Sequence, residues 1–255
     1  EPANAAGAVF ARCSRVVLSL PSHREVAAFV HENAAALRPG TTIIDTTTGD
    51  PATAEDVARK LAGRGIVYLD ATVSGSSAQV RKGSAVMMVG GDEEAFAACA
   101  DVFARLGGET FYTGGPGTGA KMKLVTNVAL GLNRAALAEA LALARGLGLD
   151  PAQALAIMRS GPAYSRIMDR KGEKMLTGDF SPEARLSQHL KDVRLIVERG
   201  REAGLPMPFS ATHRSVLESA EAAGLGALDN SAIIKVLSAP SPANDPSVCP
   251  PPPRS

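Results

Sequence analysis

The chain has 255 residues, of which 45% are apolar and 21% charged, and its formal net charge is +1. This length suits about two domains, and the apolar fraction excludes a disordered chain. The near-zero charge gives no general attraction to nucleic acid or to a membrane surface, and no apolar run reaches the roughly 18 residues of a membrane span. Three widely spaced cysteines, Cys13, Cys99 and Cys249, exclude a disulfide framework. We therefore expect no nucleic-acid partner, no membrane and a reducing, cytoplasmic location.

Short β-rich runs alternate with helical patterns in the first part of the chain. We expect strands at residues 16–20, 42–45, 66–70, 85–89 and 110–112, and helices at about 23–37, 53–62 and 93–106. Strands separated by helices of this length imply crossover connections and a largely parallel sheet. The pattern predicts an α/β domain over residues 1–116.

The pattern changes at Gly117. Residues 121–146 contain no proline, are rich in Ala and Leu, and predict a long helix of the kind that joins two domains. Further helices are expected at residues 151–160, 187–203, 208–221 and 232–237, which predicts an all-α domain over 117–238 that begins with the interdomain helix. Residues 239–255 carry seven of the 17 prolines and predict a disordered, proline-rich tail.

The segment Gly115-Pro-Gly-Thr-Gly-Ala120 has the glycine spacing of a dinucleotide fingerprint at a strand-to-helix junction. That fingerprint requires an acidic residue at the end of a second strand about 20 residues further on. Here Glu139 lies inside the continuing helix. We therefore interpret the segment as the turn that begins the long helix and not as a pyrophosphate loop.

Two other features carry candidate chemistry. Lys123 and Asn127 are four residues apart, so they share one helix face and can meet a small substrate together. The alternative is an exposed lysine with an asparagine on the helix surface, and either Lys121 or Lys123 can be the inward lysine. The polar residues 70–77 follow the third predicted strand, where Ser74 and backbone amides can hold a carboxylate. An ordinary strand-to-helix turn is the alternative. The four histidines match no zinc motif, so we expect no metal and expect most of them at surface or capping positions.

Several short segments, in this order and spacing, resemble the β-hydroxyacid dehydrogenase family, which includes 3-hydroxyisobutyrate dehydrogenases and the tartronate semialdehyde and glyoxylate/succinic semialdehyde reductases. The matching segments are Leu18-Ser-Leu-Pro21, Ile44-Asp-Thr-Thr-Thr48, Asp70-Ala-Thr-Val-Ser-Gly75, Met88-Val-Gly-Gly91, Gly117-Thr-Gly-Ala-Lys-Met-Lys-Leu-Val-Thr-Asn127 and Leu190-Lys-Asp192. Each segment alone is weakly specific, but together they cover about residues 15 to 237.

The resemblance implies hydride transfer with NAD or NADP between a small 3-hydroxy acid and its semialdehyde, without a metal, in a homodimer or homotetramer. It also assigns residues. The catalytic pair falls on Lys123 and Asn127, which also contact the substrate; the substrate-carboxylate loop falls on Ser74 and Gly75; and the cofactor contacts fall on Leu20, Pro21, Thr48 and Lys191. The assignment of Lys123 leaves Lys121 without a catalytic role.

This sequence departs from the family pattern in two ways. The family begins with a G-x-G-x-x-G strand–helix segment about 60–70 residues before the position of Leu20-Pro21. The 15 or so residues that precede the first strand here hold no such motif, which predicts an incomplete doubly wound, Rossmann-type sheet. We expect a fragment or truncated product, with a degenerate protein as the alternative. In addition, Thr72 and Ser76 stand where the family usually has Pro and Gly, which leaves the identity of the substrate open.

Two other functions compete with the enzyme. One is a non-catalytic oligomerisation or interaction module with a vestigial site. The other is a carboxylate-binding protein without redox activity. A lysine at position 123 argues against a vestigial site, because such a site has no physical need for it.

Overall fold

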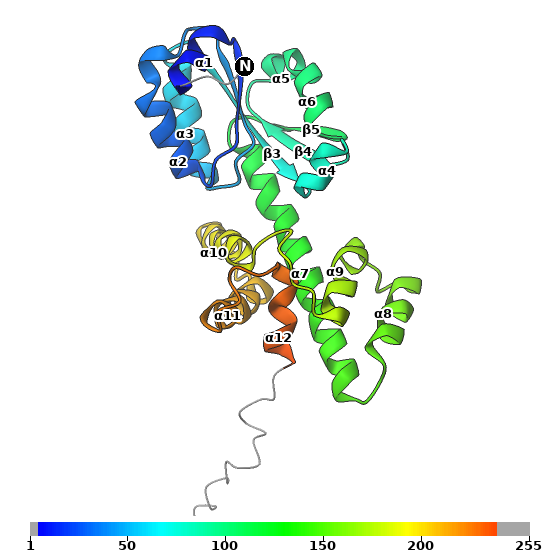
Figure 1. Cartoon of the computed structure of the whole chain (residues 1–255). Coiled ribbons are helices and arrows are strands. Elements are labelled where there is room, and N and C mark those ends of the chain that lie inside the picture. Colours follow the sequence, from blue (N-terminus) through cyan, green and yellow to red (C-terminus); the bar gives the residue numbers. More distant parts are fainter. Residues whose placement is uncertain (1–4, 239–255) are drawn as a thin grey trace, which may run out of the picture. The chain divides into compact units, whose positions relative to one another are not determined.

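The computed structural model describes residues 5–238 and forms two compact units, which divide between Asn127 and Val128 (Figure 1). The division falls inside a single helix, α7 (Thr118–Gly146), and the second unit thus starts eleven residues after the domain start expected at residue 117. The expected tail at 239–255 lies outside the described residues. Among the described helices, none has the length and apolar character required to cross a membrane.

The first unit is built on a five-stranded sheet with the strand order β1-β2-β3-β4-β5. The strands are β1 (Arg15–Leu18), β2 (Thr42–Asp45), β3 (Val67–Ser74), β4 (Val86–Gly90) and β5 (Glu109–Gly114). Neighbouring strands are parallel except for β3 and β4, which pair antiparallel from Asp70 opposite Gly90 to Ser74 opposite Val86. The fold is thus the expected α/β sheet, with one antiparallel step.

Helices cover both faces of this sheet because its strands alternate apolar side chains between the two faces. On one face, Ile43 packs with α1 (Ala6–Arg12), α2 (His23–Glu32) and α3 (Pro51–Ala62). On the other face, its neighbour Ile44 packs with residues of α5 (Glu93–Ala98) and α6 (Ala100–Leu106). Figure 1 shows the sheet between these two helical layers.

Several boundaries differ from those expected from the sequence. The first strand ends at Leu18, two residues early. The helix expected at 23–37 ends at Glu32 and is followed by a 3-10 turn, Ala34–Ala36, and the helix expected at 93–106 is interrupted at Cys99. The third strand continues to Ser74, where the sequence predicted a loop from Asp70 onward. Pairing with β4 extends this strand, and a pairing partner from elsewhere in the chain is not visible in local sequence.

The second unit is helical. It comprises the rest of α7, then α8 (Pro151–Ser160), α9 (Arg166–Thr177), α10 (Leu186–Glu202), α11 (Pro208–Ala222), a 3-10 turn (Asn230–Ile233) and α12 (Ile234–Leu237). The sequence predicted α8 with these bounds but did not predict α9. Gly172 lies in the middle of α9 and weakens its helical pattern. A Cβ at Gly172 would lie 2.6 Å from Leu155 of α8, so the close packing of the two helices requires glycine there.

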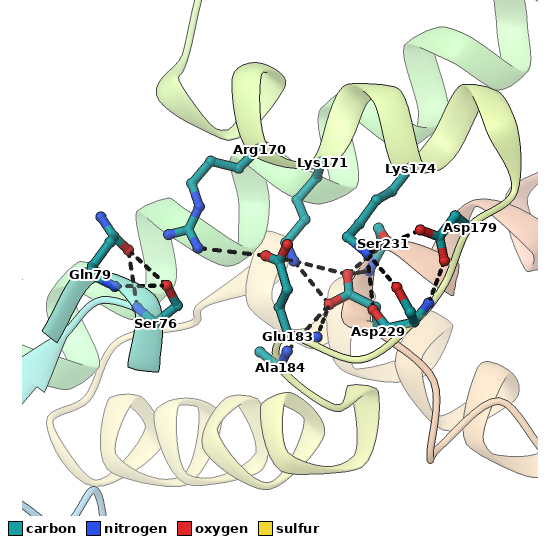
Figure 2. A network of polar contacts seen from close by, with 11 residues as sticks. Ser76, Gln79, Arg170, Lys171, Lys174, Asp179, Glu183, Ala184, Asp229 and Ser231 are labelled. Atoms are coloured by element: carbon teal, nitrogen blue, oxygen red, sulfur yellow. Dashed lines mark hydrogen bonds and ion pairs between the residues drawn. The ribbon is translucent and has the colours of Figure 1, made fainter. Parts of the chain in front are cut away.

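A buried carboxylate ties three segments of the second unit together (Figure 2). Asp229 is fully buried and accepts hydrogen bonds from Lys171 Nζ at 2.9 Å, from Ser231 Oγ at 2.7 Å, and from the backbone amides of Glu183, Ala184 and Ser231. Although burial alone would raise the pKa of Asp229, the hydrogen bonds from Lys171 and Ser231 lower it to about 2. Asp229 is therefore ionised and fully bonded at neutral pH.

Candidate active site

The first turn of α7 is held against one face of β3. Asp70, Thr72 and Ser74 occupy alternate positions on this strand and so point to the same side of the sheet. Asp70 Oδ1 and Oδ2 accept hydrogen bonds, both of 2.8 Å, from the amides of Gly117 and Ala120, and Thr72 Oγ1 donates to Gly119 O at 3.0 Å. The face of β3 that carries Ser74 is therefore the face on which α7 begins.

These contacts require glycine at position 119. A Cβ built there would lie 2.2 Å from Asp70 O and 2.6 Å from Met88 O, so the helix backbone rests directly on the two strands. The same contacts explain the glycine-rich turn. Its amides at Gly117 and Ala120 are bonded to Asp70 and are not available to a phosphate, in keeping with its interpretation as a helix start.

The two candidate lysines of α7 occupy different environments. Lys123 follows Gly119 by four residues, so it lies on the helix face that meets the sheet, and it is 8% exposed. Asn127, another four residues on, is 5% exposed. Lys121 is exposed and forms an ion pair of 2.7 Å with Glu55 of α3. The geometry thus makes Lys123, and not Lys121, the inward lysine that shares a face with Asn127.

Ser74 and Gly75 lie at the end of β3, before the short helix α4 (Ser77–Arg81). Ser74 is half-buried and Gly75 is exposed. Ser76, the residue that departs from the family pattern, caps α4: its Oγ accepts from Gln79 N while the Gln79 side chain accepts from Ser76 N (Figure 2). This capping box fixes the chain directly after the two candidate substrate residues.

The candidate cofactor residues follow β1 and β2, at the carboxyl ends of parallel strands. The loops that carry them are bonded to each other, since Leu20 N donates to Thr47 Oγ1 at 3.0 Å and Thr46 Oγ1 donates to Leu18 O at 2.8 Å. Pro21 and Thr48 are the next residues in these two loops. The pairing places both candidate cofactor segments at one edge of the sheet, where open α/β sheets bind ligands.

A buried polar cluster lies beneath these loops. Asp45 accepts from Tyr68 Oη at 2.5 Å and from Thr47 N at 2.9 Å, while His23 Nε2 is 3.7 Å from its carboxylate. His23 Nδ1 donates to Asp50 O at 2.8 Å. Burial, and then the charge of Asp45, raise the pKa of Tyr68 well above its usual value. The sequence missed this cluster, because residues so far apart in the chain meet only through the register of the sheet.

The histidines are a correction to the sequence prediction. His23, His189 and His213 are 1%, 7% and 5% exposed, and His31 alone of the four is exposed. Helix periodicity did not reveal this, because the burial depends on contacts with distant segments, as where His189 and His213 pack against Gly131 of α7. Within residues 5–238, no group of three or more His, Cys, Asp or Glu side chains is arranged to hold a metal.

Lys191 belongs to the second unit, on α10. Its ammonium lies 3.8 Å from the carboxylate of Asp192, and its side chain is 38% exposed. The first unit therefore brings together the segments of Lys123, Asn127, Ser74 and Gly75 at one sheet face and those of Leu20, Pro21 and Thr48 at one sheet edge.

Comparison with known proteins places this arrangement in a family. Residues 1–114 match the NAD binding domain of 6-phosphogluconate dehydrogenase, and residues 117–237 match the family described as NAD-binding of NADP-dependent 3-hydroxyisobutyrate dehydrogenase. Over 202 residues the chain is 36% identical to 2-(hydroxymethyl)glutarate dehydrogenase of Eubacterium barkeri, an alignment that covers 79% of this chain and 67% of that protein. The chain belongs to the β-hydroxyacid dehydrogenase family. By class it is an NAD(P)-dependent oxidoreductase.

Other members of the β-hydroxyacid dehydrogenase family agree. L-threonate dehydrogenase of Cupriavidus necator is 33% identical over 204 residues, which cover 80% of this chain and 69% of that protein. Among solved structures, the 3-hydroxyisobutyrate dehydrogenase of Mycobacterium tuberculosis with L-serine superposes with a TM-score of 0.85 at 26% identity, over 92% of this chain and 83% of that one. The α/β unit followed by a helical unit is thus the fold of this family.

The relatives also include a protein whose name is not that of an enzyme. The cytokine-like nuclear factor N-PAC of Xenopus tropicalis is 31% identical over 199 residues, which cover 78% of this chain and 37% of that protein. Similarity to the β-hydroxyacid dehydrogenase family is therefore shared by relatives named as enzymes and by relatives named as a nuclear factor. The choice between an enzyme and a non-catalytic protein thus depends on the residues of the site.

Proposed function

We propose that this protein interconverts a small 3-hydroxy acid and its semialdehyde by hydride transfer with NAD or NADP. The observation that carries the proposal is the burial of Lys123 and Asn127, one helical turn apart, on the face of α7 that meets the strand of Ser74. Burial keeps bulk water away from the Lys123 ammonium, and a charge in such a site stabilises a developing alkoxide more strongly than it would in water.

The residues of the site fit this chemistry in distinct roles. In the reductive direction, the Lys123 ammonium donates a proton to the aldehyde oxygen as that oxygen becomes an alkoxide, and it stabilises the developing charge. In the oxidative direction, its neutral amine accepts the proton of the hydroxyl group. Asn127 orients that hydroxyl without a change in its own charge. The Ser74 hydroxyl and the Gly75 amide hold the substrate carboxylate.

The segments around Leu20, Pro21 and Thr48 fit a nicotinamide cofactor, because they end two adjacent parallel strands and are bonded to each other through Thr47. The cofactor, when bound, supplies or accepts the hydride. These loops would line one side of it, while the buried Asp45 cluster holds them in place. A role for Lys191 beside the nicotinamide rests on the family resemblance alone.

A spectrophotometric assay tests the proposal. The protein is mixed with NADH or NADPH and with short semialdehydes that carry a carboxylate, and the loss of nicotinamide absorbance is followed. Lys123→Met is expected to lower kcat about 100-fold or more, the usual worth of a positioned proton donor. Lys121→Met is the matched control and is expected to change kcat less than about threefold, because that lysine is paired with Glu55. Equal turnover in the two variants would contradict the role of Lys123.

A second function, a non-catalytic interaction module, is favoured by the similarity to a relative named as a nuclear factor. Titration of the protein with NADH and NADPH, followed by nicotinamide fluorescence, separates the two. Binding of either cofactor together with turnover supports the enzyme. Absence of binding to both supports the module.

We also propose a homodimer or homotetramer. In the second unit, Leu143, Leu147 and Ile157 are each more than 60% exposed, and exposed apolar side chains on neighbouring elements are typical of subunit interfaces. Light scattering is expected to give a multiple of the chain mass, and the double change Leu147→Glu with Ile157→Glu is expected to lower it. Arg201→Glu, an exposed change on α10, is the control. A monomeric wild type would refute the assembly.

The chemistry of the cysteines is consistent with the cytoplasmic location proposed for the protein. In the described part of the chain, Cys13 and Cys99 are both free thiols. Free thiols persist in reducing compartments.

A further inference from the structure

A buried guanidinium in the second unit has no carboxylate of its own. Arg134, on α7, is 2% exposed, and within the described residues neither its Nε nor its Nη1 has a hydrogen-bond partner. Burial lowers the pKa of Arg134 to about 10, which still leaves it charged at neutral pH. A buried polar group without a partner in the protein usually marks the position of a bound ion or an ordered water molecule.

The surroundings of this guanidinium are defined by Gly131, one turn earlier on the same helix face. A Cβ at Gly131 would lie 2.9 Å from His213 Cε1 and 2.9 Å from His189 Nε2, so both rings rest against the helix backbone there. The two rings are 5.2 Å apart between centroids. Side chains on a helix lean toward the preceding turn, so Arg134 extends over Gly131 toward these rings.

His213 is a second buried polar group that lies within the electrostatic reach of Arg134. Its ring is buried, and its Nε2 has no hydrogen-bond partner among residues 5–238. Burial, followed by the nearby charge of Arg134, lowers the pKa of His213 to about 4. The imidazole is therefore neutral at physiological pH and, in the tautomer that carries the proton on Nε2, can donate to an acceptor placed between the two side chains.

The two carboxylates that surround Lys171 are already paired. Asp229 accepts two contacts of 2.9 Å from Lys171, and Glu183 lies 3.1 Å from the same ammonium and 3.6 Å from Arg170. The charge of Asp229 acts favourably on Arg134, and that of Arg170 opposes it. Because Asp229 is itself paired with Lys171, the guanidinium of Arg134 has no ion pair among the described residues, and a buried charge is strongly destabilising unless it is paired.

We propose that the second unit binds a small monovalent anion, a halide or a short carboxylate, between the guanidinium of Arg134 and the imidazole of His213. The anion accepts hydrogen bonds from Arg134 Nε or Nη1 and from His213 Nε2, and it supplies the missing negative charge. Because both side chains are buried, the site is expected to admit only small anions. It is independent of the hydride-transfer chemistry proposed above.

Thermal unfolding in different sodium salts at one ionic strength tests this site. Chloride, bromide and formate are expected to raise the Tm of the wild-type protein in a saturable way relative to gluconate, which is too large to enter. Arg134→Met fills the same volume without charge, and its Tm is expected to be the same in all four salts. Arg201→Met, an exposed change on α10, is expected to keep the wild-type response.

Two outcomes overturn the proposal: a wild-type Tm that does not depend on the identity of the anion, and an Arg134→Met variant that responds as the wild type does. If Arg134→Met does not fold, ³⁵Cl NMR line widths of the wild type decide the question. Saturable broadening that formate reverses supports the site, and its absence refutes it. A bromide-soaked crystal with water alone at the guanidinium would also refute it.

Discussion

The carboxylate of Asp70 lies 2.8 Å from the amide nitrogen of Ala120, 50 residues further along the chain. Its second oxygen accepts from Gly117. One buried side chain therefore joins the strand that leads to Ser74 with the helix that carries Lys123. The spacing of the candidate substrate residues from the candidate proton donor depends on this contact.

Asp70→Asn is expected to lower the free energy of unfolding by about 2 kcal/mol, the usual worth of hydrogen bonds to a buried charged group. An amide offers one acceptor oxygen, and its NH₂ group would face one of the two backbone amides that Asp70 satisfies. Urea unfolding measures the loss. Asp92→Asn is the control, since this exposed residue also accepts from a helix amide, and asparagine caps nearly as well. Equal stability of the two variants would show that Asp70 does not hold α7.

Gly119→Ala is expected to destabilise the first unit by about 1–3 kcal/mol, because the added methyl group overlaps the carbonyl oxygens of Asp70 and Met88 and forces α7 away from the sheet. In Gly146→Ala, at the other end of the helix, a Cβ would meet nothing within 4 Å, and this change is expected to stabilise by about 0.5–1 kcal/mol. Opposite shifts of Tm in the two variants are the result to look for. A neutral Gly119→Ala would refute the close contact.

Asp229→Asn is expected to cost about 3–5 kcal/mol, because it removes the buried carboxylate that pairs with Lys171 and leaves only the half-exposed Glu183 beside that ammonium. Asp101→Asn breaks an ion pair with Arg15 at the surface and is expected to cost less than about 1 kcal/mol. Hydrogen exchange of amides in α9 and α10 reports the loss within the second unit. Comparable exchange in the two variants would argue against Asp229 as the centre of the network.

Asp229 also predicts that the stability of the protein depends on pH in the acid range. The pKa of Asp229 in the folded protein is about 2, which is below that of an unfolded aspartate. The ionised carboxylate therefore makes its full contribution to the free energy of unfolding above about pH 4. This contribution, about 2 kcal/mol, is lost as the pH falls from about 4 to about 2. Denaturant midpoints measured across this range should fall in the wild type and change less in Asp229→Asn.

His213 predicts a second loss of stability on acidification, in a pH range above that of Asp229. Its folded pKa of about 4 is lower than the unfolded value of about 6.5, so the unfolded chain takes up the proton first. Stability is expected to fall by about 3 kcal/mol as the pH drops from about 6.5 to about 4. His213→Gln should remove most of this dependence, whereas His31→Gln, at an exposed position, should leave it intact. An unchanged pH profile in His213→Gln would refute the assignment.

The sequence predicted the features that local pattern determines. The alternation of strands and helices, the long helix α7 and the bounds of α8 all follow from the periodicity of apolar residues and from a proline at the first helical position. Lys123 and Asn127 are on one helix face because of their spacing alone. The choice between Lys121 and Lys123, however, needed Glu55, which lies 66 residues away in the chain.

What the sequence did not predict depends on contacts between distant segments. The extension of β3 to Ser74 requires β4 as an antiparallel partner, and α9 tolerates its central Gly172 because Leu155 fills the space. The buried cluster of His23, Asp45 and Tyr68 exists because β2 and β3 align in register and because α2 begins at His23 next to Asp45. The propensities of single residues carry no information about contacts between segments that are distant in the chain.

The Asp229 network has a consequence for how the protein is made on the ribosome. Asp229 joins Lys171 and the backbone at Glu183 and Ala184 to a position 45 to 58 residues later in the chain. During synthesis, α8, α9 and α10 emerge before this carboxylate does, and the ammonium of Lys171 stays hydrated until then. The helical unit can therefore close its interior only after about residue 231 has left the exit tunnel, so nascent chains that stall earlier should be sensitive to protease in α9.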